Sequence, residues 1–433
     1  MNSFIEFFTL SSPLIRNVVI GSVLLSLSSS IVGCFTFLRK RALVGDAVSH
    51  AVLPGICLAY IIRGEKDPAT LLLGAFITGW LSLQAVDFIK TKTRIKEDTA
   101  IGLVLSIFFG IGTLLLTIIQ HRPGFYDQAG LNHFIFGNAI SISKTDLQVF
   151  GSVAIIVITI VFILFKEFIL LSFDQVYMKS LGFPVKFISV LMSTLTVLAV
   201  VLGIQAVGVV LMAAMLITPA ATARFWTNSL RKMILMATLF GLISSVLGAF
   251  ISYITPSPTG PWIVMVLSFF AILSFFFAPN KGIVSRSLRH WRFKRKIIEE
   301  NILKAFFQIS EQEKSTGPFS KEKLLNKRKM ETHDVDDGLN RLVSQGFLIK
   351  ESNKYSFTEQ GQRKGQRILK LHRLWEVYMT TYMNIAPDHV HDDADSIEHI
   401  ITPELEEKLE KMLDYPTLDP HASAIPYRFE KKK

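Results

Sequence analysis

Two ionisable side chains stand inside an apolar stretch of this 433-residue chain. Asp46 and His50 are four residues apart, a spacing that places both on one face of a helix. Such groups are costly within a membrane and usually mark a path for ions. An oxygen and a nitrogen ligand suit a first-row divalent cation, so we interpret the pair as a metal site in a membrane helix. The alternative is an aspartate that caps a helix beside a histidine hydrogen-bonded within a bundle.

A second group of nitrogen and oxygen donors lies near the other end of the chain. Its members are spaced so that several share one helical face. They are His372, Glu376, His391, Asp395, Glu398 and His399. Three imidazoles and three carboxylates are enough for two sites with nitrogen and oxygen ligands. The alternative is a solvated acidic helix whose histidines have no common role.

The two groups of donors lie in parts of different composition. Half of the chain is hydrophobic and its mean hydropathy is +0.40. Residues 1–289 carry 21 Lys+Arg against 11 Asp+Glu, whereas residues 290–433 carry 25 against 24. This contrast predicts a membrane part at 1–280, a basic linker at 281–296 and a soluble remainder. The only cysteines, Cys34 and Cys57, exclude a disulfide framework and a cysteine-based zinc site.

Apolar runs long enough to span a membrane recur along the first part. They predict nine helices near 14–38, 44–62, 69–88, 99–119, 147–165, 187–203, 205–222, 233–254 and 261–278. Basic residues gather in alternate connections, which predicts an outside N-terminus and a cytoplasmic C-terminal part in the plasma membrane. If 205–222 is re-entrant, eight spans remain and this parity argument fails. The predicted fold class is therefore mostly α, a polytopic helical bundle of eight or nine spans.

The basic linker at 281–296 has two interpretations. Lysines and arginines beside a membrane usually contact anionic lipid. Alternatively, a polar and mobile hinge is open to proteases, which would release the soluble part.

The sequence around Asp46 and His50 carries a family resemblance. Residues 45–55 read Gly-Asp-Ala-Val-Ser-His-Ala-Val-Leu-Pro-Gly. This segment resembles the signature of membrane permeases of ATP-binding-cassette importers for manganese, zinc and iron, and the resemblance covers about the first 280 residues. It implies that Asp46 and His50 belong to a transmembrane metal site.

The segment 173–184 also resembles that family, at the loop that docks on the ATPase. Asp174 is a suitable N-cap, Lys179 lies in the following helix, and Gly182 is a suitable helix stop. The alternative is an ordinary amphipathic connector.

The chain contains no Gly-x-x-x-x-Gly-Lys-Ser/Thr phosphate loop. We therefore expect a transport subunit rather than an enzyme, with ATP hydrolysis by a separate ATPase chain. The resemblance further implies an extracytoplasmic metal-binding protein and two permease copies per transporter.

The soluble part begins with a helix at 297–310, followed by helices at 320–330 and 332–345. Two strands at 346–350 and 354–358 then resemble a wing, so 297–361 is predicted to be a winged helix-turn-helix that binds operator DNA. The candidate DNA-binding residues are Lys327, Arg328, Lys329, His333, Asp336 and Arg341.

Residues 297–428 resemble the metal-dependent repressors of the diphtheria-toxin-repressor family. The motifs that carry the resemblance are Leu371-His372-Arg373-Leu374-Trp375-Glu376, Glu398-His399 and Pro416-Thr417-Leu418-Asp419-Pro420-His421. It implies that 362–428 form a metal-binding and dimerisation domain. By this resemblance Asp395, Glu398 and His399 lie in one site, and His372, Glu376 and His391 line its neighbour. Asp395, where iron-responsive members often carry cysteine, favours manganese, with Fe(II) and zinc as alternatives.

The chain departs from the repressor pattern in two places. Asn301 and Lys304 stand where the family supplies ligands from its first helix, which leaves the site short of a ligand. The recognition helix carries Asp334, Asp336 and Asp337. Their carboxylates can accept a hydrogen bond from cytosine but repel phosphate.

These observations predict an importer permease fused to a metal-responsive repressor that proteolysis can release. The rival hypothesis is a metal-sensing domain that gates the permease without binding DNA.

Overall fold

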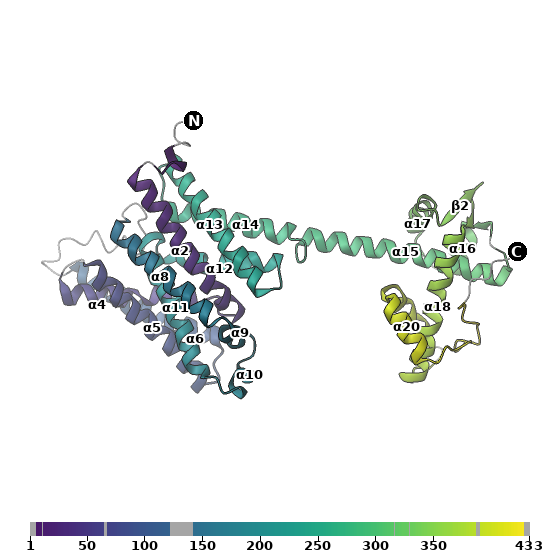
Figure 1. The fold of residues 1–433 in the computed structure, drawn as a ribbon, viewed down its shortest axis with the longest axis horizontal. Coiled ribbons are helices and arrows are strands. Elements are labelled where there is room, and N and C mark those ends of the chain that lie inside the picture. The colour runs from purple at the N-terminus through teal and green to yellow at the C-terminus, as the bar shows by residue number, and fades with distance from the viewer. Residues whose placement is uncertain are drawn as a thin grey trace. The chain divides into compact units, whose positions relative to one another are not determined.

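The computed structural model describes residues 6–10, 12–64, 67–121, 142–315, 317–328, 330–386 and 390–427. Within the chain, two compact units meet at Arg286 and Ser287. This division agrees with the change in composition along the sequence. Figure 1 labels most of the helices of both units and the strand β2.

The first unit is a bundle of helices. Its elements are α2 (Pro13–Leu38), α3 (Val44–Ala51), α4 (Leu53–Arg63), α5 (Pro68–Lys92), α6 (Glu97–His121), α8 (Lys144–Ile163), α9 (Phe165–Phe173), α10 (Gln175–Ser180), α11 (Val185–Val207), α12 (Val209–Trp226), α13 (Leu230–Ile254) and α14 (Thr259–Phe277). Among the described residues, eight segments are long and apolar enough to cross a membrane, with α3 and α4 together forming one of them. The predicted class, a helical membrane bundle of eight or nine spans, is confirmed.

The helix α12 lies in the segment predicted as a span at 205–222, and the described residues alone do not place it among the eight. It starts at Val209, because Gly208 adopts a positive φ of 91° and ends α11 there. Met212, Leu216 and Ala220 are fully buried, so α12 lies within the bundle. A side chain at Gly33 of α2 would come within 1.8 Å of the Leu216 carbonyl oxygen, so α2 and α12 are in backbone contact.

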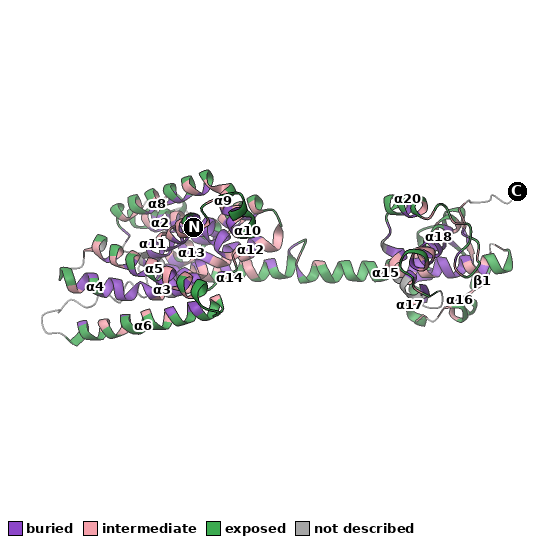
Figure 2. Ribbon diagram, turned by 90° about the horizontal axis from the view of Figure 1, so that it is seen from below, coloured by how far each residue is buried: buried purple, intermediate pink, exposed green. Residues whose placement is uncertain are grey.

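The outer helices of this unit remain exposed. Figure 2 shows α6 as largely exposed along its length, whereas much of α3 and α4 is buried. The exposed side chains of α6 are apolar, among them Leu103, Ile107 and Leu114. A surface of this kind is stable against lipid or against another apolar helix.

The second unit combines helices with a small sheet. Its elements are α15 (Ile283–Glu313), β1 (Phe319–Ser320), α16 (Lys321–Lys327), α17 (Thr332–Ser344), β2 (Leu348–Glu351), β3 (Lys354–Phe357), α18 (Glu359–Tyr382), α19 (Val390–Ile397), η3 (Glu398–Ile400) and α20 (Pro403–Met412). The antiparallel sheet has the order β1-β3-β2, with Phe319 opposite Tyr355 and Leu348 opposite Phe357. The predicted helix-turn-helix and wing are both present, and β1 is a strand that was not predicted.

The helix α15 begins at Ile283 rather than near residue 297. It therefore includes most of the segment predicted as a linker, because residues 283–313 contain no glycine or proline to end a helix. Its last turns carry Phe306, which packs against Phe319 and Tyr355 of the sheet with ring centroids 5.6 and 6.3 Å away. This contact anchors α15 in the core of the second unit.

Glycines allow α4 and α5 to touch. A side chain at Gly55 would lie 2.0 Å from the Gly74 carbonyl oxygen, and one at Gly74 would lie 2.3 Å from the Gly55 carbonyl oxygen. We predict that Gly55→Ala or Gly74→Ala destabilises the bundle by about 1–3 kcal/mol, because overpacking forces the backbones of α4 and α5 apart. Size-exclusion chromatography after heating in detergent would measure the loss of monodisperse protein.

Gly102→Ala on α6 is the matched control, since nothing lies within 4 Å of the position its side chain would take. Its melting should be unchanged or slightly higher, because alanine favours helix. Equal melting of Gly55→Ala and Gly102→Ala would contradict the close contact.

An ion-pair network joins α18 to α20. Lys370 lies 2.6 Å from carboxylate oxygens of Glu406 and Glu410, and Arg367 lies 2.8 Å from Glu406. Burial alone would raise the pKa of Glu406, but the hydrogen bonds from Lys370 and Arg367 outweigh it and hold this pKa below its usual value. Since the folded-state pKa is lowered, the stabilisation is present above pH 4.5 and is lost as the pH falls through the folded-state value.

We predict that Glu406→Gln lowers the stability of the second unit at pH 7 by about 1–3 kcal/mol, since it removes charge-assisted hydrogen bonds from a largely buried group. The difference from the parent chain should shrink below pH 4.5. Thermal unfolding of the full chain as a function of pH would measure this. Glu407→Gln, on the same helix but exposed, should have little effect.

Candidate metal sites

Asp46 and His50 lie on α3, and the structure brings them together. His50 Nε2 is 3.4 Å from Asp46 Oδ1. The side of α3 that points away from this pair, with Val48 and Ala51, is fully buried against its neighbours. The Asp46 side chain is 46% exposed and the His50 side chain 25%, so the pair lies on the open face of the helix. Two donors that converge on an open face can bind a cation together with ligands from elsewhere.

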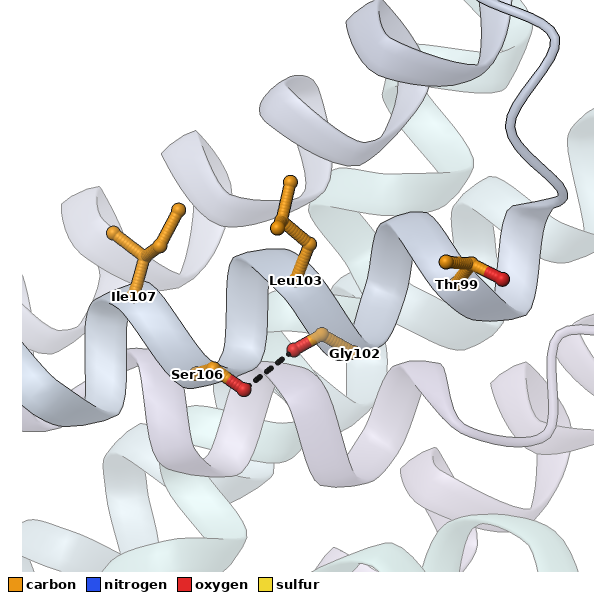
Figure 3. Close-up of a pocket in the computed structure, with 5 residues that line it drawn as sticks. All are labelled: Thr99, Gly102, Leu103, Ser106 and Ile107. Atoms are coloured by element: carbon orange, nitrogen blue, oxygen red, sulfur yellow. Dashed lines mark hydrogen bonds between the residues drawn. The ribbon is translucent and has the colours of Figure 1, made fainter.

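The neighbouring helix α6 contributes an aromatic side chain beside His50. The His50 ring meets the Phe109 ring edge to face, with centroids 5.1 Å apart. Farther along α6, a shallow hollow of about 590 Å³ is lined by Thr99, Gly102, Leu103, Ser106 and Ile107 (Figure 3). The Ser106 hydroxyl donates to the Gly102 carbonyl at 2.9 Å, so its polarity is satisfied within the helix. The hollow therefore suits an apolar occupant rather than a metal ion.

A buried arginine positions α3. Arg41, in the turn between α2 and α3, is 7% exposed and pairs with Asp87 of α5 at 2.6 Å. It also pairs with Glu97 at the start of α6. A buried charge is stable only when it is paired, so this contact fixes the turn against both helices. These partners lie 46 and 56 positions from Arg41 in the sequence, so local pattern does not identify them.

The structure supports the predicted boundaries of the segment 173–184. The Asp174 carboxylate accepts from the Tyr177 backbone amide at 2.8 Å and caps α10. Gly182 has a φ of 81°, which ends the helical turn. Lys179, Val176 and Tyr177 are exposed, which leaves α10 with an uncovered surface.

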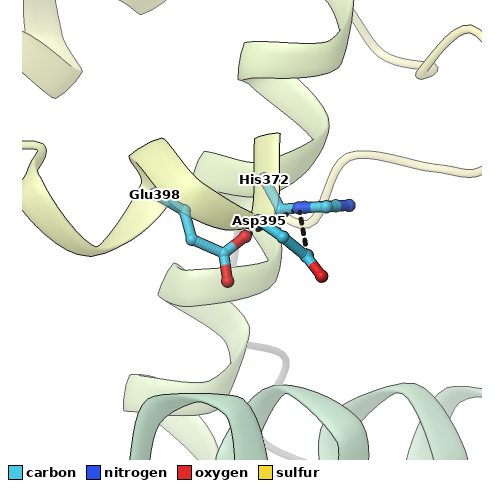
Figure 4. Close-up of side chains that lie close together, drawn as sticks. All are labelled: His372, Asp395 and Glu398. Carbon is cyan, nitrogen blue, oxygen red and sulfur yellow. Dashed lines mark hydrogen bonds and ion pairs between the residues drawn. The ribbon is translucent and has the colours of Figure 1, made fainter. Parts of the chain in front are cut away.

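In the second unit, three of the predicted ligands converge. His372 of α18, Asp395 of α19 and Glu398 of η3 offer ligand atoms that all lie within 4.8 Å of one another (Figure 4). His372 Nδ1 is 2.7 Å from Glu398 Oε2 and 3.3 Å from Asp395 Oδ1. We refer to His372, Asp395 and Glu398 as the ion cluster.

A lysine from α15 enters the ion cluster. Lys304 Nζ is 2.9 and 3.0 Å from the two oxygens of Glu398 and 3.3 Å from His372 Nδ1, and it also pairs with Asp395. The Lys304 side chain is 1% exposed. Arg328, at the end of α16, pairs with the other oxygen of Asp395 at 2.6 Å.

The other predicted ligands lie beside the ion cluster. Glu376 Oε1 is 3.1 Å from His372 Nε2. His399 Nδ1 is 2.7 Å from Glu300 Oε2, a carboxylate of α15 that the sequence analysis did not single out. His399 Nε2 is buried and makes no hydrogen bond to the described residues, although it lies 3.6 Å from Glu398 Oε1. The side chain of His391 lies outside the described part of the structure.

Ionisation of the cluster follows from its charges. Burial opposes a charged imidazole, but hydrogen bonds to Glu376 and Glu398 outweigh it and raise the pKa of His372. Burial would likewise raise the pKa of Asp395, but the charges of Lys304 and Arg328 outweigh it and lower this pKa. Asp395 therefore favours its ionised form and His372 favours its charged form.

The metal implied by the repressor resemblance can be tested against these contacts. The donor types suit a divalent cation. However, a metal bonds to such ligands at about 2.0–2.2 Å, and it would have to take the space that the ammonium of Lys304 fills. With Lys304 in this position, the ion cluster does not fit a metal ion. His399 Nδ1 pairs with Glu300, and its Nε2, 3.6 Å from Glu398 Oε1, borders the ion cluster without a hydrogen bond.

The predicted DNA-binding residues fall into two groups. Lys327, His333 and Asp336 are exposed, and Asp336 pairs with Lys321 at 2.5 Å. Arg328 and Arg341 are instead held within the unit, by Asp395 and by Glu299 at 2.8 Å. Lys329 lies outside the described residues.

Comparisons with known proteins place both units. The model of the ABC 3 transport family matches residues 11–278, and that of the iron dependent repressor, metal binding and dimerisation domain, matches residues 358–427. The manganese transport system membrane protein MntC of Bacillus subtilis is 37% identical over 388 residues, which cover 89% of this chain and 88% of that protein. The alignment thus extends well beyond the membrane unit.

Two further proteins match the membrane unit. The zinc transport system membrane protein TroC of Treponema pallidum is 41% identical over 282 residues, covering 65% of this chain and 93% of that protein. The solved structure of PsaBC from Streptococcus pneumoniae in complex with Fab is 36% identical with a TM-score of 0.58, covering 66% of this chain and 99% of that chain.

These matches confirm the predicted fusion of a metal permease with a metal-dependent repressor domain, and they confirm divalent metal ions as the ligand class. With eight candidate spans, the protein is an integral membrane protein with a soluble C-terminal domain. The chain belongs to the ABC 3 transport family of membrane permeases, and it carries at its C-terminus a domain of the iron dependent repressor type.

Proposed function

We propose that the chain imports a divalent metal ion, with manganese as the first candidate, through a path that includes Asp46 and His50. The observation that carries this proposal is the convergence of the two side chains on the open face of α3, 3.4 Å apart. The named functions of MntC and TroC, manganese and zinc transport, support the same class of cargo.

A second copy of the chain would complete the path. Two donors are too few for a first-row metal, which prefers at least four ligands. Two copies related by a twofold axis would bring two Asp46–His50 pairs together and supply four. The exposed apolar face of α6, beside His50, is the kind of surface that such a partner would cover.

ATP hydrolysis is assigned to a separate subunit, and metal delivery to an extracytoplasmic metal-binding protein. The exposed surface of α10, with Lys179, is the proposed docking element. Beside it lies a hollow of about 220 Å³ whose lining includes Arg39, Lys40, Lys90 and Gln175. A basic hollow beside an uncovered helix suits an acidic face of a cytoplasmic partner, and it agrees with the cytoplasmic side that the positive charges predict.

The C-terminal unit is proposed to regulate transcription of the importer genes by binding operator DNA. The exposed Lys327 of α16 and the exposed Lys350 and Lys354 of the wing can contact phosphates. The negative charge of Asp336 on α17 opposes such binding, except where its carboxylate accepts a hydrogen bond from a cytosine. A unit attached to the membrane cannot reach most of the chromosome. Proteolysis within 281–296 would release it.

Asp46→Ala or His50→Ala should reduce manganese uptake by at least about tenfold, because even supporting groups of metal sites contribute 10–100-fold. Uptake of radioactive manganese by cells with equal amounts of each variant would measure this. His121→Ala, at the exposed end of α6, is the control and should transport normally. Unchanged uptake with Asp46→Ala would refute the proposed path.

DNA binding is tested by gel shift of the full chain in detergent with the DNA upstream of its own gene. Replacing Lys327 by alanine should lower the slope of log affinity against log salt by about one, since one phosphate contact is lost. Lys411→Ala on α20 is the matched control and should leave the slope unchanged. If no shift occurs, while removal of residues 287–433 changes uptake, the domain is a gate rather than a repressor.

A further inference from the structure

The position of Lys304 points to a regulatory property of the C-terminal unit. In the ion cluster, three donors that could bind a metal instead surround one ammonium group. Lys304 is 1% exposed and approaches His372, Asp395 and Glu398 from α15. A buried lysine is stable only when its charge is paired, so this arrangement is not an accident of a mobile surface side chain.

The charges of the ion cluster are balanced without a metal. Lys304, Arg328 and the charged form of His372 supply three formal positive charges, and Asp395, Glu398 and the neighbouring Glu376 supply three formal negative charges. A divalent cation added to this group would leave two uncompensated positive charges in a poorly solvated site. To bind, it would have to expel the Lys304 ammonium into surroundings that offer it no other described partner.

The same contacts join separate elements of the unit. Lys304 comes from α15, Arg328 from the end of α16, His372 from α18, Asp395 from α19 and Glu398 from η3. The cluster thus connects the first helix and the helix-turn-helix to the metal-binding and dimerisation domain. A cation at its centre is what holds these elements together.

We propose that Lys304 is a built-in cation that replaces a divalent metal in the ion cluster, so that the C-terminal unit keeps this arrangement without metal. The inference deepens the proposed function and rests on it only in taking the unit as the regulatory part of the importer. Any response to metal must then come from the transport path or from His399, whose Nε2 makes no hydrogen bond to the described residues. The ion cluster itself does not sense metal.

The test counts manganese ions bound per full-length chain in detergent, by equilibrium dialysis and electron paramagnetic resonance. His372→Ala should bind the same number as the parent chain, because the cluster holds none. Lys304→Glu, which replaces the ammonium by a carboxylate, should bind one more. Loss of one ion in His372→Ala, or an unchanged count in Lys304→Glu, would overturn the proposal.

Thermal unfolding of the C-terminal unit gives a second measurement that does not depend on transport. A chelator should leave the melting of the parent chain unchanged and should lower that of Lys304→Glu by several degrees, since a bound ligand stabilises the folded state. Lys304→Met, of similar length but uncharged, should melt lower than the parent, because it removes the ammonium that contacts both oxygens of the buried Glu398. A destabilisation of the parent chain by the chelator that disappears in His372→Ala would contradict the built-in cation.

These measurements separate the two proposals. If Asp46→Ala transports normally, the transport path is refuted, and the melting and binding results for Lys304 are unaffected. If His372→Ala loses one bound ion, the built-in cation is refuted, and the uptake results for Asp46 and His50 still stand.

Discussion

The constraint on which this structure depends is that charge removed from water must be balanced by charge. Arg41 is buried among the helices of the membrane unit and is compensated by Asp87 and Glu97. Lys304 is buried in the soluble unit and is compensated by Asp395 and Glu398. In both places the pairing also decides the geometry, since it fixes the turn before α3 in one case and joins α15 to α18 and η3 in the other.

Asp46 and His50 differ from these buried pairs in an informative way. They lie within a segment able to span a membrane, yet they are only partly buried and have an open side. In a membrane, the groups that balance the charge of this pair then have to come from outside the described residues. This is the arrangement expected of a site that binds a cation transiently, whereas Lys304 permanently satisfies the cluster around it.

Much of the fold follows from local pattern. The long apolar runs predicted the spans, because water-soluble proteins rarely contain uninterrupted hydrophobic segments long enough to cross a membrane. The spacing of Asp46 and His50 predicted their convergence because both lie on one short helix. The cap at Asp174 and the stop at Gly182 were also predictable, since each depends on a single residue type. By contrast, the burial of α12 depends on neighbours such as Gly33, which periodicity cannot identify.

The candidate sites were less predictable because their partners are distant in sequence. The sequence marked Lys304 as a departure from the family pattern, but its insertion between residues on α18, α19 and η3 required the structure. The pairing of His399 with Glu300 and of Arg328 with Asp395 likewise spans many residues. The linker at 281–296 was predicted from charge, whereas the helical structure there follows from the absence of glycine and proline.

We therefore propose that the two halves of this chain hold positive charge by different means, one for a passing ion and one for a built-in ammonium. Anomalous diffraction at the manganese edge from crystals of the full chain grown with manganese would test this distinction directly. The account predicts a peak at Asp46 and His50 and none among His372, Asp395 and Glu398. A peak within the ion cluster, with none at Asp46 and His50, would contradict it.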